Sequence, residues 1–215
     1  MNYPLTRGLL LYGIGLGLLL AVTGCSFLAA GAYVLFPNDV KAHFPGLRGK
    51  KTAVVCRAAS LEFAEPGVSR ELAARIGMLM QKNDDRIMVI DPEKLADWTD
   101  RNDWTEFRQI GKALKADMVV GIELERFTIS QGSTLLQGQA DARIAVYDMK
   151  EGGKLVYELK PRTIKFPPNS PISSAERQEA DFRNQFVDIV ADTLARNFYD
   201  YDSRAYQATD STALR

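Results

Sequence analysis

Apolar residues between positions 51 and 200 recur with two different periods, which predict strands and helices in turn. Residues 51–57 and 87–90 are short, almost continuously apolar runs, typical of strands buried on both faces of a sheet. Between them, residues 68–82 carry apolar side chains every three or four positions, so we expect an amphipathic helix there.

Two further helices are predicted after the second strand. Asp91 followed by Pro92 is a helix start, with Asp91 as the N-cap, and this helix ends near Trp98. Residues 103–106, Asp-Trp-Thr-Glu, resemble a capping box that opens the next helix. The buried stripe predicted for that helix consists of Phe107, Ile110 and Leu114.

Three strands then follow as a meander, over residues 118–129, 137–149 and 154–160, with a Gly-Gly turn at 150–153. Polar and apolar residues alternate along them, which indicates a sheet with one face in water. The alternation changes phase at Phe127, so we expect a bulge near that residue.

A last amphipathic helix is predicted over residues 173–198, and the Ser-, Thr- and Ala-rich tail 201–215 is predicted to be disordered. The order of elements is β-α-β-α-α-β-β-β-α. Alternating units followed by a meander predict one α/β (α+β) domain, residues 51–200, with a mixed sheet of about five strands and helices packed on it.

The N-terminus has the layout of a secretion signal. A single early cation, Arg7, precedes an uncharged apolar run that closes in small residues before Cys25. Residues 20–25, Leu-Ala-Val-Thr-Gly-Cys, resemble the lipobox of bacterial lipoproteins. The resemblance implies that residues 1–24 are a signal peptide, that Cys25 is the lipidation site, and that residues 25–50 are a lipidated tether. Two or three acyl chains on one residue give firm anchoring.

An uncleaved anchor is the alternative. The chain stays apolar after Cys25, and residues 8–36 together are long enough to cross the ~30 Å hydrocarbon core of a bilayer as one helix. For a spanning helix, the cations that follow it would favour a cytoplasmic C-terminal domain; they are Lys41, Arg48, Lys50 and Lys51. A cleaved signal has no such conflict with a periplasmic domain. Both interpretations attach the protein to a membrane.

Charge and cysteine content narrow the classes of partner. The 27 basic and 27 acidic residues cancel, so the chain lacks the basic surface that nucleic-acid binding needs. Apart from Cys25 the only cysteine is Cys56, so acylation of Cys25 leaves no internal disulfide. Within an apolar run, Cys56 is interpreted as a buried structural thiol.

Candidate catalytic chemistry is sparse. With His43 as the only histidine, neither a zinc site nor a Ser-His or Cys-His dyad is expected, and we predict no metal, no cofactor and no catalytic residue. Acidic residues do gather at Asp97, Asp100, Asp103 and Glu106. We interpret them as helix caps and solvated side chains, with acid/base carboxylates or a calcium loop as the alternative.

Two tryptophans, Trp98 and Trp104, bracket this acidic loop. Each could anchor its helix to the sheet. Tryptophan is also favoured at interface hot spots, so we predict these two residues as a possible partner-binding site.

The middle of the chain resembles a known family through four segments. These are 70–73 (Arg-Glu-Leu-Ala), 87–91 (Ile-Met-Val-Ile-Asp), 110–121 (Ile-Gly-Lys-Ala-Leu-Lys-Ala-Asp-Met-Val-Val-Gly) and 146–148 (Val-Tyr-Asp). Together they are similar to the anticodon-binding-like domain of penicillin-binding-protein activator lipoproteins, the curli secretion channel lipoprotein and the Tol periplasmic protein. The resemblance covers residues 51–160.

This resemblance implies an envelope protein that binds or assembles with other envelope components, without a catalytic residue to carry over. It does not imply a pore, because the hairpin at 125–143 is too short to cross a bilayer. The lipopolysaccharide-assembly lipoproteins are a weaker match, since the two helices predicted within 92–115 argue against them.

Two functions of different classes follow from the sequence. The first is a non-catalytic interaction or assembly module, anchored in the bacterial envelope with a periplasmic domain and an envelope protein as partner. The second is a small envelope hydrolase that uses acidic residues. The single histidine and the neutral charge favour the first.

Overall fold

The structure, a computed structural model, describes residues 39–59 and 67–203. The predicted signal or anchor segment, including Cys25, and the tail from residue 204 lie outside these ranges. Among the described residues, no helix combines the length and the apolar character that crossing a membrane requires.

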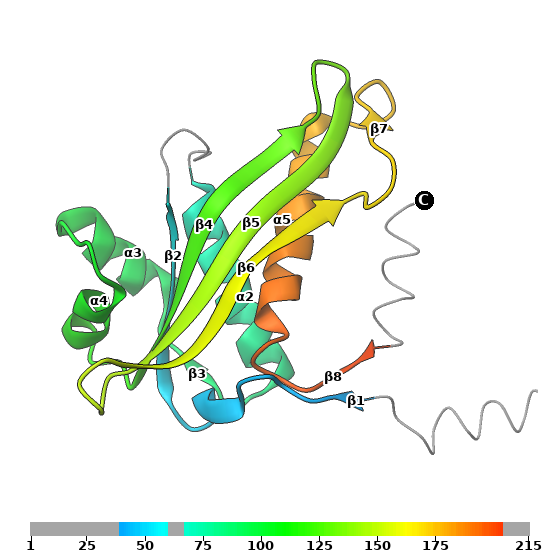
Figure 1. The fold of residues 1–215 in the computed structure, drawn as a ribbon. Helices are drawn as coiled ribbons and strands as arrows, with labels where there is room; N and C mark the ends of the chain where they lie inside the picture. Colours follow the sequence, from blue (N-terminus) through cyan, green and yellow to red (C-terminus); the bar gives the residue numbers. More distant parts are fainter. Residues whose placement is uncertain (1–38, 60–66, 204–215) are drawn as a thin grey trace, which may run out of the picture.

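One mixed sheet of six strands forms the centre of the fold (Figure 1). Its strands are β2 (Lys51–Ala58), β3 (Met88–Val89), β4 (Met118–Ser130), β5 (Leu135–Asp148), β6 (Lys154–Phe166) and β7 (Ile172–Ser173). Five of them follow the order β3-β2-β4-β5-β6, and β7 pairs with β5. Because β2 runs parallel to β3 and β4 while the meander is antiparallel, the predicted α+β class with a mixed sheet is confirmed.

Two long helices, α2 (Val68–Asn83) and α5 (Glu179–Ala195), cover one face of the sheet (Figure 1). Of the apolar stripe predicted for α2, Val68, Leu72 and Ile76 are buried at 0% exposure, and Leu79 is partly buried. It meets the inward side chains of β2, β4 and β5 in the main core. The strands are therefore apolar on this face because two helices exclude water from it.

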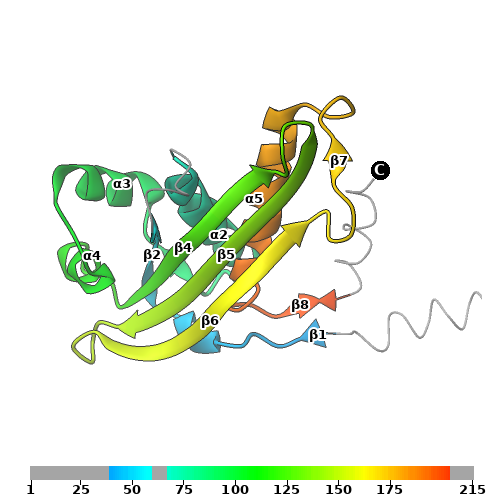
Figure 2. The same cartoon turned by 45° about the horizontal axis from the view of Figure 1, so that its top comes forward.

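Two short helices, α3 (Pro92–Arg101) and α4 (Phe107–Ala113), stand together beside β2 (Figure 2). With the outer side chains of β2 and β4 they form a smaller core on the opposite face of the sheet. Asp91 caps α3 as predicted, its side chain accepting a hydrogen bond from the Glu93 N–H. The rest of this face carries ion pairs, such as Arg143 with Glu123 at 3.3 Å.

Several element boundaries differ from the sequence-based expectation. The capping box of α4 is formed by Glu106 and Gln109, not by residues 103–106, because the Gln109 side chain accepts the Glu106 N–H. Strand β6 continues past residue 160 to Phe166, with Pro161 in an irregular stretch of this edge strand, where a missing N–H is tolerated. Helix α5 begins at Glu179, later than predicted, because residues 172 and 173 pair with β5 instead.

The predicted bulge in β4 is confirmed. The register between β4 and β5 shifts between Leu124 and Arg126, so Glu125 is the extra residue. The shift lets both Leu124 and Phe127 face the main core, which accounts for the phase change in the sequence.

Residues 39–50 pack against the domain. Strand β1 (Asp39–Val40) pairs with β8 (Tyr201–Asp202) (Figure 2). Both ends of the described chain therefore lie at this pair of strands. The short 3-10 helix η1 (Pro45–Leu47) inserts Leu47 into the core at 0% exposure. The Phe44 ring stacks on Tyr157, with centroids 5.2 Å apart. The packed structure therefore continues beyond both ends of the predicted domain, residues 51–200.

Candidate functional site

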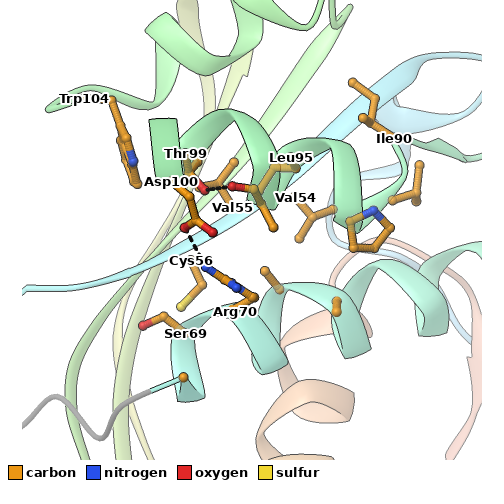
Figure 3. A pocket seen from close by; sticks show the side chains of 16 residues that line it. Val54, Val55, Cys56, Ser69, Arg70, Ile90, Leu95, Thr99, Asp100 and Trp104 are labelled. Atoms are coloured by element: carbon orange, nitrogen blue, oxygen red, sulfur yellow. Dashed lines mark hydrogen bonds and ion pairs between the residues drawn. The ribbon is translucent and has the colours of Figure 1, made fainter. Parts of the chain in front are cut away.

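A groove with a volume of about 320 Å³ lies between α2 and α3 (Figure 3). We call it the α2–α3 groove. Its floor is the middle of β2, at Val54, Val55 and Cys56. Its walls carry small or apolar side chains, among them Ala73 and Ala74 of α2 and Leu95 and Ala96 of α3.

The groove follows a strand edge that is only partly paired. Strand β3 pairs with Lys51 and Thr52 of β2, and the Ile90 N–H donates to the Thr52 carbonyl at 2.8 Å. Within the described ranges, no other strand lies beside this edge of β2, whereas its opposite edge pairs with β4 up to Ala58. Backbone N–H and C=O groups along such an edge are a template for a further extended segment.

An ion pair crosses the mouth of the groove (Figure 3). The Arg70 guanidinium of α2 donates to the Asp100 carboxylate of α3 at 2.6 Å. The two side chains are 61% and 56% exposed. A pair this exposed contributes only about 0–1 kcal/mol, so an incoming ligand can displace it at little cost.

Cys56 lies at one end of the groove near Ser69 (Figure 3). Burial raises the pKa of the Cys56 thiol to about 12, and a hydrogen bond with Ser69 only partly opposes this. The thiolate is therefore scarce at neutral pH, and the thiolate is the nucleophilic form of cysteine. The interpretation of Cys56 as a buried thiol agrees with its 8% exposure.

The two predicted tryptophans have different positions. Trp104 lines the α2–α3 groove, and its ring lies 5.9 Å from that of Phe107. Trp98 belongs to α3 but does not line the groove, and both side chains are half-buried against the smaller core. The groove thus contains Trp104 alone of the pair.

The acidic residues of the same loop do not form one site. Asp97 pairs with Arg101 at 3.8 Å, Glu106 pairs with Arg108 at 2.8 Å, and Asp100 pairs with Arg70. Each of these carboxylates is thus bound to a different arginine. Among the described residues, no group of three His, Cys, Asp or Glu side chains is placed to hold a metal ion.

Sequence reasoning missed Arg70, Ser69 and Thr99, which also line the groove. They lie on helices separated by a strand, and no local motif connects them. Only the packing of α2 and α3 against the same strand brings them together.

Comparison with known proteins supports no assignment to a family. No family model matches the chain, and no curated protein sequence matches it significantly. Among solved structures, the lipoprotein GNA1162 from Neisseria meningitidis is similar at 12% identity, over 67% of this chain and 96% of its own, with a TM-score of 0.44. The LpoB C-terminal domain from Salmonella enterica is 9% identical, over 54% of this chain and 83% of its own, with a TM-score of 0.37.

A minor lipoprotein from Acinetobacter baumannii is similar at 13% identity, over 69% of this chain and 91% of its own, with a TM-score of 0.34. Two of these three similar structures are thus named as bacterial lipoproteins.

Proposed function

We propose that this chain is a membrane-anchored protein of the bacterial envelope that binds a partner protein in the α2–α3 groove and catalyses no reaction of its own. The observation that carries the proposal is the edge of β2 beyond Thr52, which pairs with no strand of the described residues and forms the floor of a groove with apolar walls. The anchor is proposed from the sequence of residues 8–36, and the periplasmic location from the resemblance of residues 20–25 to a lipobox.

The groove suits an extended polypeptide better than a compact small molecule. A strand edge offers N–H and C=O groups at a regular spacing, which an added strand satisfies with its own main chain. The alanines at 73, 74 and 96 leave room for alternate side chains of such a strand. The partner segment is therefore proposed to be extended and apolar where it faces these alanines.

The hydrolase alternative has less support. The groove contains one thiol, Cys56, whose raised pKa keeps it protonated, and its described lining residues include a single carboxylate, Asp100. The only histidine, His43, does not line this groove. A nucleophile with an adjacent base is the arrangement that hydrolysis by covalent catalysis requires.

Site-specific photo-crosslinking in intact cells tests the groove. A photo-crosslinking amino acid at Ala96, which lines the groove, is expected to give a protein adduct of one defined mass. The same amino acid at Met78, which is 59% exposed on α2 and outside the groove, is the matched control. Equal adducts at both positions, or an adduct at Met78 alone, would contradict the proposed binding site.

Metabolic labelling with a palmitate analogue tests the anchor. Cys25→Ala is expected to abolish labelling and to leave an unprocessed precursor, whereas Cys56→Ala should retain labelling because that thiol is buried. Unchanged labelling and mobility in Cys25→Ala would support the uncleaved anchor over residues 8–36 instead.

A further inference from the structure

A second cavity, of about 490 Å³, lies between the outer edge of β6, the end of α5, and the β1–β8 pair. We call it the β6–α5 cavity. It is separate from the α2–α3 groove and shares no lining residue with it. Its volume falls in the range of cavities that bind organic ligands, about 300–1,000 Å³.

The charged side chains that line this cavity have one sign, and the carboxylates of Asp141 and Asp192 lie just outside the lining, bound to Thr163 and Arg196. Arg162, Lys165 and Arg196 line it together with His43, and among its described lining residues there is no carboxylate. Arg196 is partly neutralised, because it forms an ion pair with Asp192 outside the lining and stacks on the Tyr201 ring at 4.9 Å. Arg162 and Lys165 lie exposed on the edge strand β6. In a chain with no net charge, this local excess of cations favours an anionic ligand.

Hydrogen-bonding groups accompany the cations. Tyr201 and Ser203 bring hydroxyl groups to the lining. The hydroxyls of Thr163 and Thr193 also line the cavity but donate to the Asp141 carboxylate and the Ile189 carbonyl, and the Asn197 amide donates to the Leu194 carbonyl. Guanidinium and hydroxyl groups are the usual ligands of phosphate oxygens, and arginine can bind them in a bidentate manner.

The remaining lining is apolar. Ile164 and Phe166 of β6 and Ile189 of α5 line the cavity. A free phosphate ion is fully hydrated and gains nothing from apolar walls. A lipid headgroup has a phosphate attached to glycerol and acyl carbons, and these carbons are stabilised by contact with such side chains.

The cavity is also close in sequence to the apolar N-terminal segment. Residues 37–42 separate His43 from Phe36, where that segment ends. Even fully extended, this stretch spans at most about 25 Å. If the apolar residues up to Phe36 lie at the membrane, as the uncleaved anchor over residues 8–36 requires and an acylated Cys25 allows, the cavity is within reach of lipid headgroups.

We propose that the β6–α5 cavity binds the phosphate-bearing headgroup of an anionic phospholipid. The phosphate contacts Arg162, with Lys165 at the rim, and the first carbons of the lipid contact the apolar residues of β6 and α5. Bound in this way, a lipid would orient the domain on the bilayer to which the chain is attached.

Calorimetric titration of the full-length protein in a non-ionic detergent tests this proposal without depending on the anchor. The probes are dihexanoyl phosphatidylglycerol, dihexanoyl phosphatidylcholine and inorganic phosphate. We expect one saturable site for the anionic lipid, with about tenfold weaker binding of the other two probes. The affinity should also fall with ionic strength, because the cations are exposed.

Charge-reversal variants test which residues bind the lipid headgroup. Arg162→Glu is expected to weaken phosphatidylglycerol binding by about tenfold, and Lys165→Glu to weaken it in the same direction. Lys160→Glu is the matched control: it lies on the same strand, is exposed, does not line the cavity, and should change the affinity by less than about twofold. All three positions are exposed, so circular dichroism should show an unchanged fold.

Three results would overturn the proposal. Equal binding of phosphatidylcholine and phosphatidylglycerol would mean that the negative charge is not recognised. Inorganic phosphate that binds as tightly as the lipid would make this a free-anion site. An equal loss of affinity in Lys160→Glu and Arg162→Glu would mean that the lipid is attracted by the general surface charge and not by this cavity. The absence of saturable binding would mean that the cavity is not a lipid site. None of these outcomes bears on crosslinking at the α2–α3 groove, so failure of the two proposals is distinguishable.

Discussion

The ring of Phe107 in α4 occupies the space in which a side chain of Gly121 in β4 would lie. A β-carbon at Gly121 would stand 2.5 Å from Cδ2 of Phe107 and 2.7 Å from Cγ, closer than such atoms approach. The same ring also receives the Arg57 guanidinium, 4.8 Å from its centroid. Gly121 thus lets α4 dock on the sheet, and α4 completes the smaller core beside α3.

Gly121→Ala should therefore destabilise the domain by about 1–3 kcal/mol, because the added methyl group forces the Phe107 ring to move within a packed core. Urea unfolding of residues 39–203, followed by circular dichroism, measures the change.

Phe107→Leu supplies the control in a double-mutant cycle. The smaller side chain makes room for the methyl group, so Gly121→Ala should cost less in the Phe107→Leu background than in the native protein. Additive effects of the two substitutions would show that the steric contact is not the cause.

A buried carboxylate, Asp84, ties the N-terminal segment to the end of α2. Its side chain is 5% exposed and accepts hydrogen bonds from Arg48 at 2.7 Å and from Arg86 at 2.8 Å. The hydrogen bond from Arg86, followed by that from Arg48, lowers the pKa of Asp84 far below its usual range, although burial opposes the shift.

Because the folded-state pKa is lowered, the stabilisation is complete above the pKa of an unfolded aspartate, about 3.9, and is lost progressively as the pH falls from that value through the lowered folded-state pKa. Asp84→Asn should reduce the free energy of unfolding by about 2 kcal/mol or more at pH 7, and the difference from the native protein should shrink towards pH 3. Urea unfolding at the two pH values measures this.

Asp85→Asn is the control for this prediction, since Asp85 is the exposed neighbour. It should change stability little at either pH. A deficit in Asp84→Asn that is the same at pH 7 and pH 3 would argue against the ionic origin of the effect.

Leu47 is an apolar residue in a segment rich in turn signals, yet it is fully buried. Leu47→Ala should destabilise the domain by about 2–5 kcal/mol, the cost of a cavity in a packed core. Leu155→Ala removes the same atoms at a position that is 46% exposed and should cost much less.

A fragment that starts at residue 48 should accordingly unfold at a lower temperature than one that starts at residue 39. Equal stability of these fragments would mean that residues 39–47 contribute nothing.

The two tryptophans should differ in their effect on partner binding. Trp104 lines the α2–α3 groove and Trp98 does not, while both are half-buried. Trp104→Ala should therefore weaken the crosslink formed from Ala96 several-fold, and Trp98→Ala should weaken it less. Thermal unfolding of both variants distinguishes a weakened partner contact from a loss of the folded structure. If the two variants are equally stable and weaken the crosslink equally, Trp104 has no specific role in binding.

Much of the fold follows from local patterns in the sequence. The apolar run of β2, the stripe of α2 and the Asp91-Pro92 start of α3 were predictable, because each results from a periodicity or a cap within a few residues. The bulge at Glu125 was predictable for the same reason, since an inserted residue changes the phase of a strand. The proposed anchor also rests on the sequence alone, because an apolar segment that ends in Cys25 is a local property.

The tertiary structure decided what distant residues do together. The burial of Leu47 had no periodic signal, because a single apolar residue in a turn shows no pattern until it meets α2 and the sheet. The α2–α3 groove combines Cys56, Arg70 and Asp100, and the β6–α5 cavity combines His43, Arg162 and Arg196. Local sequence patterns determine which elements form, whereas a cavity depends on which elements pack side by side, and that is settled only by the burial of all apolar faces at once.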